Sequence, residues 1–89
     1  MIPAQCRAAR AMLDMTRPQL AEAAGLELPL VAAFEQGGGQ APAAAVRAMR
    51  RALERAGIEF TNESGPGVRL KPAPVEFFRP DQLTSENDG

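Results

Sequence analysis

Residues 16–37 read as two short helices joined by a tight turn, and this pattern restricts the possible folds more than any other part of the chain. Thr16 and Gln19 have the spacing of a capping box, which predicts a helix that begins at Thr16. Pro18 falls in the first turn, where its missing N–H removes no helical hydrogen bond. Gly25 supplies the left-handed conformation that ends a helix, so only about seven residues are helical here.

A second short helix is predicted from about Leu28 to Gln36, with Pro29 in its first turn and Gly37 at its end. Leu26 lies in the connecting turn, and its apolar side chain is expected to fill the angle between the two helices. Two short helices joined in this way form a helix-turn-helix arrangement, in which the second helix protrudes from the body of the protein.

Longer helices are predicted on both sides of this unit. Residues 3–15 repeat apolar side chains at helical spacing. Residues 42–56 form the longest predicted helix, with Pro42 at its first position and Gly57 after its end. One face of this helix is apolar and the others carry charge. The residues of the apolar stripe are Ala45, Val46, Met49, Ala52 and Leu53.

The periodicity then changes from helical to alternating. Residues 58–61 and 68–71 both alternate apolar and polar side chains around a loop rich in turn residues, which predicts a β-hairpin. Two strands alone are marginally stable in water, so the hairpin is expected to pack on the fourth helix or on a second subunit. Residues 72–89 are rich in proline and polar residues and predict an extended acidic tail, in which Val75–Phe78 is apolar enough to contact the body or a partner.

We therefore expect a mainly α fold: a helix-turn-helix domain over residues 1–57, a hairpin over 58–71 and a tail over 72–89. The chain has 89 residues, no His and one Cys, which excludes Ser-His-Asp and Cys-His catalysis and a four-ligand Cys/His zinc site. A single Cys fits a reducing cytoplasm, and neither a membrane span nor a leader is expected. We expect no cofactor and no enzymatic activity.

Charge is distributed unevenly along the chain. Residues 1–71 carry nine basic and seven acidic side chains, whereas residues 72–89 carry one basic and four acidic side chains. A basic body with an acidic tail is compatible with a nucleic-acid partner, although the excess is small.

Residues 9–26 resemble the opening of a lambda-repressor-like (XRE, Cro/CI-type) helix-turn-helix DNA-binding domain. Residues 34–37 and 52–60 continue the resemblance, and residues 65–70 are similar to the end of short bacterial members of that family. The similarity covers roughly residues 5–71. It implies a four-helix domain that binds double-stranded DNA and inserts its third helix into the major groove.

The resemblance also implies individual roles. Arg17 occupies the position that holds a DNA phosphate, and the loop at residues 37–40 places backbone N–H groups near another phosphate. The first two turns of the third helix would face base edges, and arginines of the fourth helix would add affinity. The DNA-binding residues implied are Arg17, Gln19, Glu27, Leu28, Pro29, Ala32, Ala33, Gln36, Gly38, Gly39, Gln40, Arg47 and Arg50.

The chain departs from the family pattern in the third helix. Base readout usually uses Arg, Lys, Gln or Asn side chains, and none occurs here before Gln36. Glu27 at the cap favours the helix dipole but repels phosphates. Leu28 and Pro29 are suited to thymine methyl groups instead. The charged face around Glu54 is equally consistent with solvated charges and with phosphate contacts.

The resemblance implies a transcriptional regulator of the repressor type that binds a palindromic operator as a homodimer. We expect dimerisation through Ile58, Phe60, Val68 and Leu70. The alternative is a protein-interaction adaptor, such as an antirepressor or an antitoxin that covers its partner with the tail, and the apolar third helix favours it.

Three further expectations concern packing. Arg10 is expected to pair with Glu35 and to brace the first helix against the third, as in this fold class. Cys6 is expected to be a small buried apolar residue. Phe34 and Phe60 are expected in the core.

Overall fold

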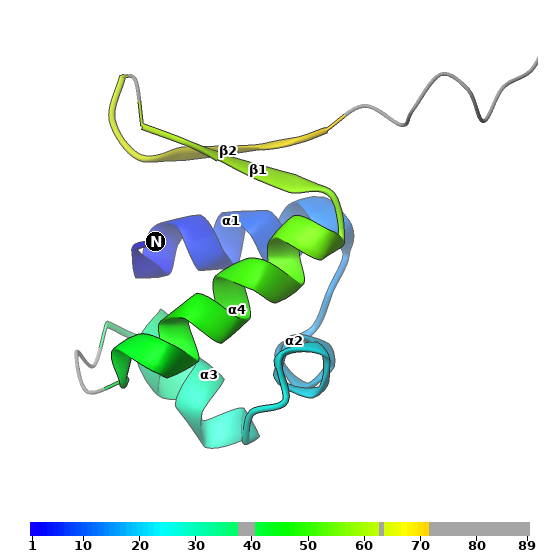
Figure 1. The fold of residues 1–89 in the computed structure, drawn as a ribbon, viewed down its shortest axis with the longest axis vertical. Helices are drawn as coiled ribbons and strands as arrows, with labels where there is room; N and C mark the ends of the chain where they lie inside the picture. The colour runs from blue at the N-terminus through cyan, green and yellow to red at the C-terminus, as the bar shows by residue number, and fades with distance from the viewer. Residues whose placement is uncertain (38–40, 63, 72–89) are drawn as a thin grey trace, which may run out of the picture.

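The computed structural model describes residues 1–37, 41–62 and 64–71, and the predicted tail, Gly38, Gly39 and Gln40 lie outside this part of the chain. Four helices are followed by one antiparallel hairpin, which confirms the expected mainly α class (Figure 1). The elements, in chain order, are α1 Pro3–Leu13, α2 Arg17–Ala24, α3 Leu28–Glu35, α4 Ala43–Arg55, β1 Ile58–Thr61 and β2 Gly67–Leu70.

The ends of α2 form as the sequence predicts. The Gln19 N–H donates to the Thr16 hydroxyl at 3.2 Å, and the Thr16 N–H donates to the Gln19 side chain at 2.8 Å, which completes the capping box. Gly25 has φ +70°, and the Leu26 N–H then donates to the carbonyl of Ala21 at 2.8 Å. Leu26 packs against the core, so this turn fixes the direction in which α3 leaves α2.

Two helix ends differ from the expected ones. The first helix ends at Leu13 because Asp14 adopts a left-handed conformation with φ +52°, which no glycine at that position signals. Pro42 caps α4 from an extended conformation instead of occupying the first helical position. Both differences are as small as the usual variation in where a helix boundary is assigned.

A single apolar cluster joins all four helices and the hairpin. Leu20 from α2, Val31 from α3, Met49 and Leu53 from α4 and Ile58 from β1 are each at most 1% exposed. Cys6 and Ala9 complete the cluster from α1, and Phe34 belongs to it as expected. The small residues bring the helix axes close together, which is how a chain with four Phe and no Trp or Tyr closes its core.

The hairpin packs on α1 and α4 through its own apolar face (Figure 1). Ile58 pairs with Leu70 and Phe60 pairs with Val68, so these four side chains share one face of the hairpin. Ile58 is buried, Phe60 and Val68 are half-buried against the core, and only Leu70 is exposed, at 52%. The expectation that all four residues serve a dimer interface is therefore wrong for Ile58, because its side chain is already enclosed within this chain.

A buried glutamine fastens the hairpin to α1. The Gln5 side chain donates to the carbonyl of Gly67 at 2.9 Å and accepts from the Ile2 N–H at 2.9 Å. Gln5 is 6% exposed, so both ends of its amide are satisfied inside the protein. The Lys71 N–H extends the ladder to Gly57 at 2.7 Å.

Within the described residues, no helix combines the length and the apolar character that crossing a bilayer requires.

Candidate nucleic-acid interface

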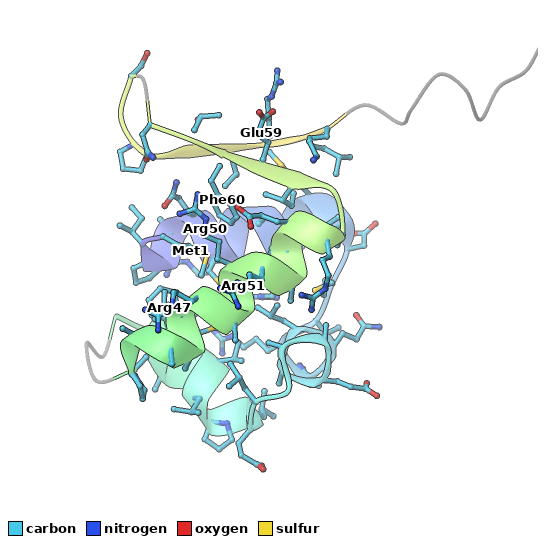
Figure 2. All side chains as sticks on the ribbon, in the orientation of Figure 1. Met1, Arg47, Arg50, Arg51, Glu59 and Phe60 are labelled. Carbon is cyan, nitrogen blue, oxygen red and sulfur yellow. The ribbon has the colours of Figure 1, made fainter. Side chains whose placement is uncertain are left out.

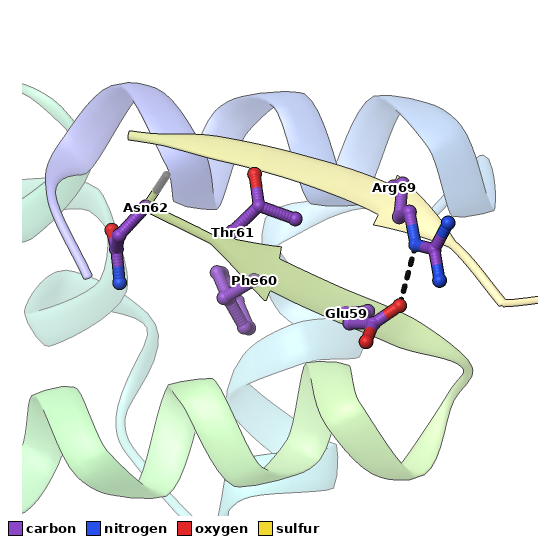
Figure 3. Close-up of a pocket in the computed structure, with 5 residues that line it drawn as sticks. All are labelled: Glu59, Phe60, Thr61, Asn62 and Arg69. Carbon is purple, nitrogen blue, oxygen red and sulfur yellow. Dashed lines mark hydrogen bonds and ion pairs between the residues drawn. The ribbon is translucent and has the colours of Figure 1, made fainter. Parts of the chain in front are cut away.

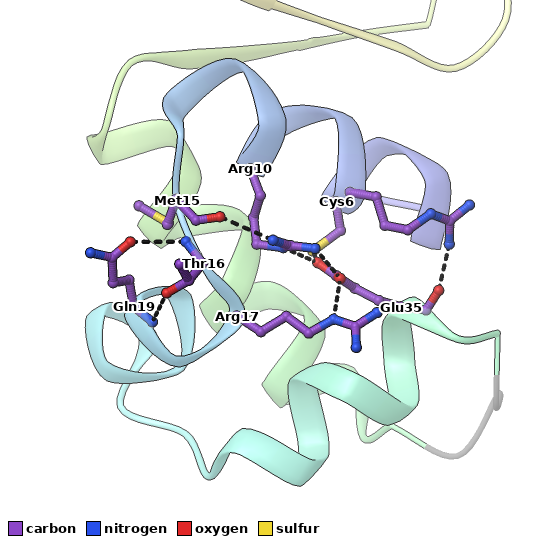
Figure 4. A network of polar contacts seen from close by, with 8 residues as sticks. Cys6, Arg10, Met15, Thr16, Arg17, Gln19 and Glu35 are labelled. Atoms are coloured by element: carbon purple, nitrogen blue, oxygen red, sulfur yellow. Dashed lines mark hydrogen bonds and ion pairs between the residues drawn. The ribbon is translucent and has the colours of Figure 1, made fainter.

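The side chain of Glu35, the last residue of α3, is the centre of a polar network that joins the first three helices (Figure 4). Arg10 donates to its two carboxylate oxygens at 2.6 Å each, in the bidentate geometry that suits a guanidinium. Arg17 adds a bond from Nε at 2.9 Å, and the Cys6 thiol donates at 3.0 Å. Glu35 itself is 1% exposed. The expected Arg10–Glu35 brace is confirmed, and two further donors strengthen it.

The surroundings of Glu35 hold it ionised. Burial opposes the charge, but hydrogen bonds from Arg10, Cys6 and Arg17 outweigh burial and place the pKa of Glu35 at about 2, below its ordinary value of 4.5. The same contact acts in the opposite sense on Cys6, because burial and the neighbouring carboxylate raise the pKa of its thiol to about 12. The expectation that Cys6 is a small buried residue is confirmed, since its side chain is fully enclosed.

Arg17 lies at the first position of α2, where a phosphate-binding role is expected. Its Nε contacts Glu35, while about a third of its side chain (34%) reaches solvent. Within the described residues its two terminal amino groups make no hydrogen bond. The Glu35 contact orients the guanidinium, and the terminal amino groups keep their capacity to bind an anion.

Arg7 belongs to the same edge of the molecule and was missed by reading the sequence. Its guanidinium donates to the backbone carbonyl of Glu35, at the C-terminal end of α3. The residue is exposed. A cation at that end of a helix complements the helix dipole. The available signal was the i, i+3 spacing of Arg7 and Arg10 on α1, which places both near whatever Arg10 binds.

The outer face of α3 is apolar. Leu28 is 42% exposed, Pro29 is exposed, and Ala32 and Ala33 are half-exposed. These four residues occupy adjacent turns of one side of the helix, because Val31, Phe34 and Glu35 take the buried side. The structure thus brings together the four positions that were expected to face base edges, with the exposed Glu27 at the cap and the exposed Gln36 at the other end.

The arginines of α4 divide into engaged and open groups (Figure 2). Arg50 pairs with Glu54 at 3.0 Å and lies over the ring of Phe60, 5.0 Å from its centre. Arg55 donates to the carbonyl of Ala23 at 3.1 Å. Arg47 and Arg51 are exposed and four residues apart, and neither makes a hydrogen bond or ion pair to the described part of the chain. Within the described residues, Arg47 and Arg51 are therefore the unpaired arginines of α4, whereas Arg50, which was also expected to contact DNA, is paired with Glu54.

The side-chain oxygen of Gln19 accepts a hydrogen bond from the Thr16 N–H in the capping box of α2. The expected contact of Gln19 with DNA therefore has to be compatible with this hydrogen bond. The expected contacts of Gly38, Gly39 and Gln40 lie outside the described residues.

A shallow hollow of about 470 Å³ lies on the hairpin, lined by Glu59, Phe60, Thr61, Asn62 and Arg69 (Figure 3). Glu59 and Arg69 form an ion pair across the two strands at 2.5 Å, and both side chains are largely exposed. The hairpin lies on the side of the helical body away from α3 (Figure 1). Apart from Phe60 the lining of the hollow is polar, and its two charged side chains are paired with each other, so it has little to hold a small molecule. In the described part of the chain, no group of acidic, Cys or His side chains has the composition of a metal site.

Comparison of the sequence with protein-family models and with curated proteins gives no match.

Proposed function

We propose that this protein binds double-stranded DNA through α3 and acts as a cytoplasmic transcriptional regulator of the repressor type. The observation that carries the proposal is the exposed outer face of α3 on a helix-turn-helix unit whose turn, capping box and Glu35 brace are all formed. An exposed helix held rigidly at the edge of a small domain is the element that enters a major groove, which is about 12 Å wide.

Arginines of α1, α2 and α4 supply positive charge to the proposed interface. Arg7 and Arg17 both contact Glu35 at the end of α3, Arg7 is exposed, and about a third of the Arg17 side chain (34%) reaches solvent. Arg47 and Arg51 offer two further cations from α4. Phosphate contacts supply much of the affinity of DNA-binding proteins and set their position on the duplex. Exposed Glu22 and Glu27 oppose this attraction, so the affinity for an unselected duplex is expected to be modest.

Binding of the full chain to a fluorescent duplex, followed by anisotropy over a range of salt concentrations, tests the proposal. Each phosphate contact contributes a slope of about −0.9 in log K against log salt. The double variant Arg47→Ala/Arg51→Ala removes two exposed cations without breaking a hydrogen bond seen in the structure, and it should reduce the slope by about 2. Arg69→Ala on the hairpin is the matched control, and its slope should equal that of the wild type.

The proposal is contradicted if the wild type does not bind the duplex at low salt, or if its binding does not weaken as salt is added. Equal slopes for the double variant and for Arg69→Ala would mean that α4 does not contribute to the interface.

Binding of a palindromic operator requires two copies. Of the set expected at a dimer interface, Ile58 is enclosed within the chain, Phe60 and Val68 are half-buried, and Leu70 is exposed. Sedimentation of wild type and Leu70→Ser at matched concentrations, with and without duplex, tests whether Leu70 takes part.

The exposed Leu28 and Pro29 also favour a second function, that of a protein-interaction adaptor. Apolar side chains next to the acidic Glu27 suit a protein partner with apolar and basic groups. This function predicts binding that changes little with salt and is insensitive to loss of Arg47 and Arg51.

A further inference from the structure

The proposed DNA-binding face of α3 has an unusual composition. Between Leu28 and Glu35, all of which the structure describes, the only side chain with a hydrogen-bonding group is Glu35 itself. Glu35 is buried and bound to Arg10, Arg17 and Cys6. The exposed side of the helix therefore presents C–H groups alone, from Leu28, Pro29, Ala32 and Ala33.

The backbone of the first turn offers few donors in their place. Pro29 has no N–H, and the Leu30 N–H donates to the carbonyl of Glu27 at 3.1 Å. A helix N-terminus usually has several N–H groups free to bind an acceptor on a base or a phosphate. At the start of α3 the N–H groups of residues 29 and 30 are not free, the first because proline has none and the second because it is already bonded. The backbone therefore does little to replace the missing polar side chains.

In the major groove, one feature of a base pair is apolar: the methyl group at C5 of thymine. From the composition of this face we infer that α3 selects its DNA site through thymine C5-methyl groups, so that the preferred ligand is a duplex with thymines in the major-groove stretch that α3 covers. This inference rests on the proposed function. It goes beyond that function because DNA binding alone does not specify which chemical group of the DNA is recognised, and this inference names that group.

Leu28 is the principal reading residue under this inference. Its side chain extends furthest of the four and is 42% exposed, whereas Ala32 and Ala33 are short and half-exposed. Alanine methyl groups one turn along permit close approach of the helix to the groove floor. Glu27 at the cap accepts hydrogen bonds only and adds charge repulsion, so it lowers affinity for every duplex alike.

The test compares duplexes that differ only in C5-methyl groups. The full chain is titrated into an alternating dA–dT duplex and into the same duplex with deoxyuridine in place of thymidine. It is also titrated into an alternating dG–dC duplex with cytosine or with 5-methylcytosine. Each methyl group buried on binding is expected to tighten it about fourfold, so the methylated member of each pair should bind more tightly. A preference in both pairs supports the inference.

Two variants locate the effect. Leu28→Ser should remove most of the methyl preference while keeping the salt dependence, because Leu28 carries no charge and does not belong to the buried core cluster. Met12→Ser is the matched control, since Met12 is apolar and exposed to a similar extent (46%) but lies on α1. It should keep the preference. Circular dichroism of both variants checks that they are folded.

Salt-dependent binding with equal affinity for the methylated and unmethylated duplexes overturns the inference and leaves the proposed function standing. A methyl preference that survives Leu28→Ser also overturns it, because α3 is then not the reader. Absence of salt-dependent binding to all four duplexes overturns the proposed function and this inference together.

Discussion

Arg10 donates two hydrogen bonds of 2.6 Å to Glu35, and this contact links the last turn of α1 to the last residue of α3. Arg17 brings the start of α2 to the same carboxylate at 2.9 Å. A single buried acid therefore sets the relative positions of three helices. The exposed face of α3 depends on this arrangement, because α3 has only eight residues and would not hold its direction alone.

Glu35→Gln should destabilise the fold strongly. The variant keeps the shape of the side chain but leaves the Arg10 guanidinium, 17% exposed, without its counter-ion. Removing one partner of a buried pair costs about 3–5 kcal/mol, and the solvent access of Arg10 should bring the loss to the lower end. Urea denaturation followed by circular dichroism measures it. Glu54→Gln, which breaks the exposed pair with Arg50, is the control and should cost less than about 1 kcal/mol. Equal losses would contradict the central role of Glu35.

Acid should weaken the fold in a defined pH window. The pKa of Glu35 is lowered from 4.5 to about 2 in the folded protein, so its charged form contributes stability above pH 4.5. That contribution is lost progressively as the pH falls from 4.5 to about 2, because the unfolded state takes up the proton first. When unfolding is measured between pH 7 and pH 2, the urea concentration at the midpoint should decrease as the pH is lowered through this window. In Glu35→Gln the fall should be smaller, and an identical profile would contradict the prediction.

The thiol of Cys6 should react only when the protein unfolds. Burial and the Glu35 carboxylate raise the pKa of the thiol to about 12, so very little thiolate is present at neutral pH, and the side chain is 0% exposed. Labelling with a disulfide reagent at pH 7 should be slow in buffer. The rate should rise in parallel with the unfolded fraction as urea is added. Rapid labelling of the native protein would show that α1 opens locally at this position.

Ile58 and Leu70 stand opposite each other in the hairpin but should respond differently to truncation. Ile58→Ala removes a side chain that is 1% exposed and should cost about 2–5 kcal/mol. Leu70→Ala alters a side chain that is 52% exposed and should cost less than about 1 kcal/mol. Thermal melts of the two variants under the same conditions make the comparison. A large loss for Leu70→Ala that depends on protein concentration would instead show that Leu70 is covered in a dimer.

Local signals in the sequence were sufficient for most elements. The capping box at Thr16 and Gln19 and the glycine at residue 25 predict α2 almost to the residue, because the groups that end a helix are its own neighbours in the chain. Asp14 shows where this approach stops. Its left-handed conformation ends α1 early, and an Asp at that position is compatible with several conformations, so its neighbours do not decide among them.

The candidate site was predictable in part. The four outer residues of α3 follow from helical periodicity, since Val31 and Phe34 have to face inward. The family resemblance led to the Arg10–Glu35 pair. The contact of Arg7 with Glu35 was missed, because a guanidinium can reach any of several partners and only the packed structure shows which are within reach.

The amino-acid sequence by itself determined the order and type of the elements and the polarity of each helix face, because capping, glycine conformations and apolar spacing act over a few neighbouring residues. Tertiary structure decided which partner each face meets. The hairpin's apolar face packs on α1 and α4 of the same chain, and Arg7, Arg10 and Arg17 meet at Glu35. These contacts join residues distant in sequence, and their stability depends on burial and on the loss of water, which exist only once the helices have packed.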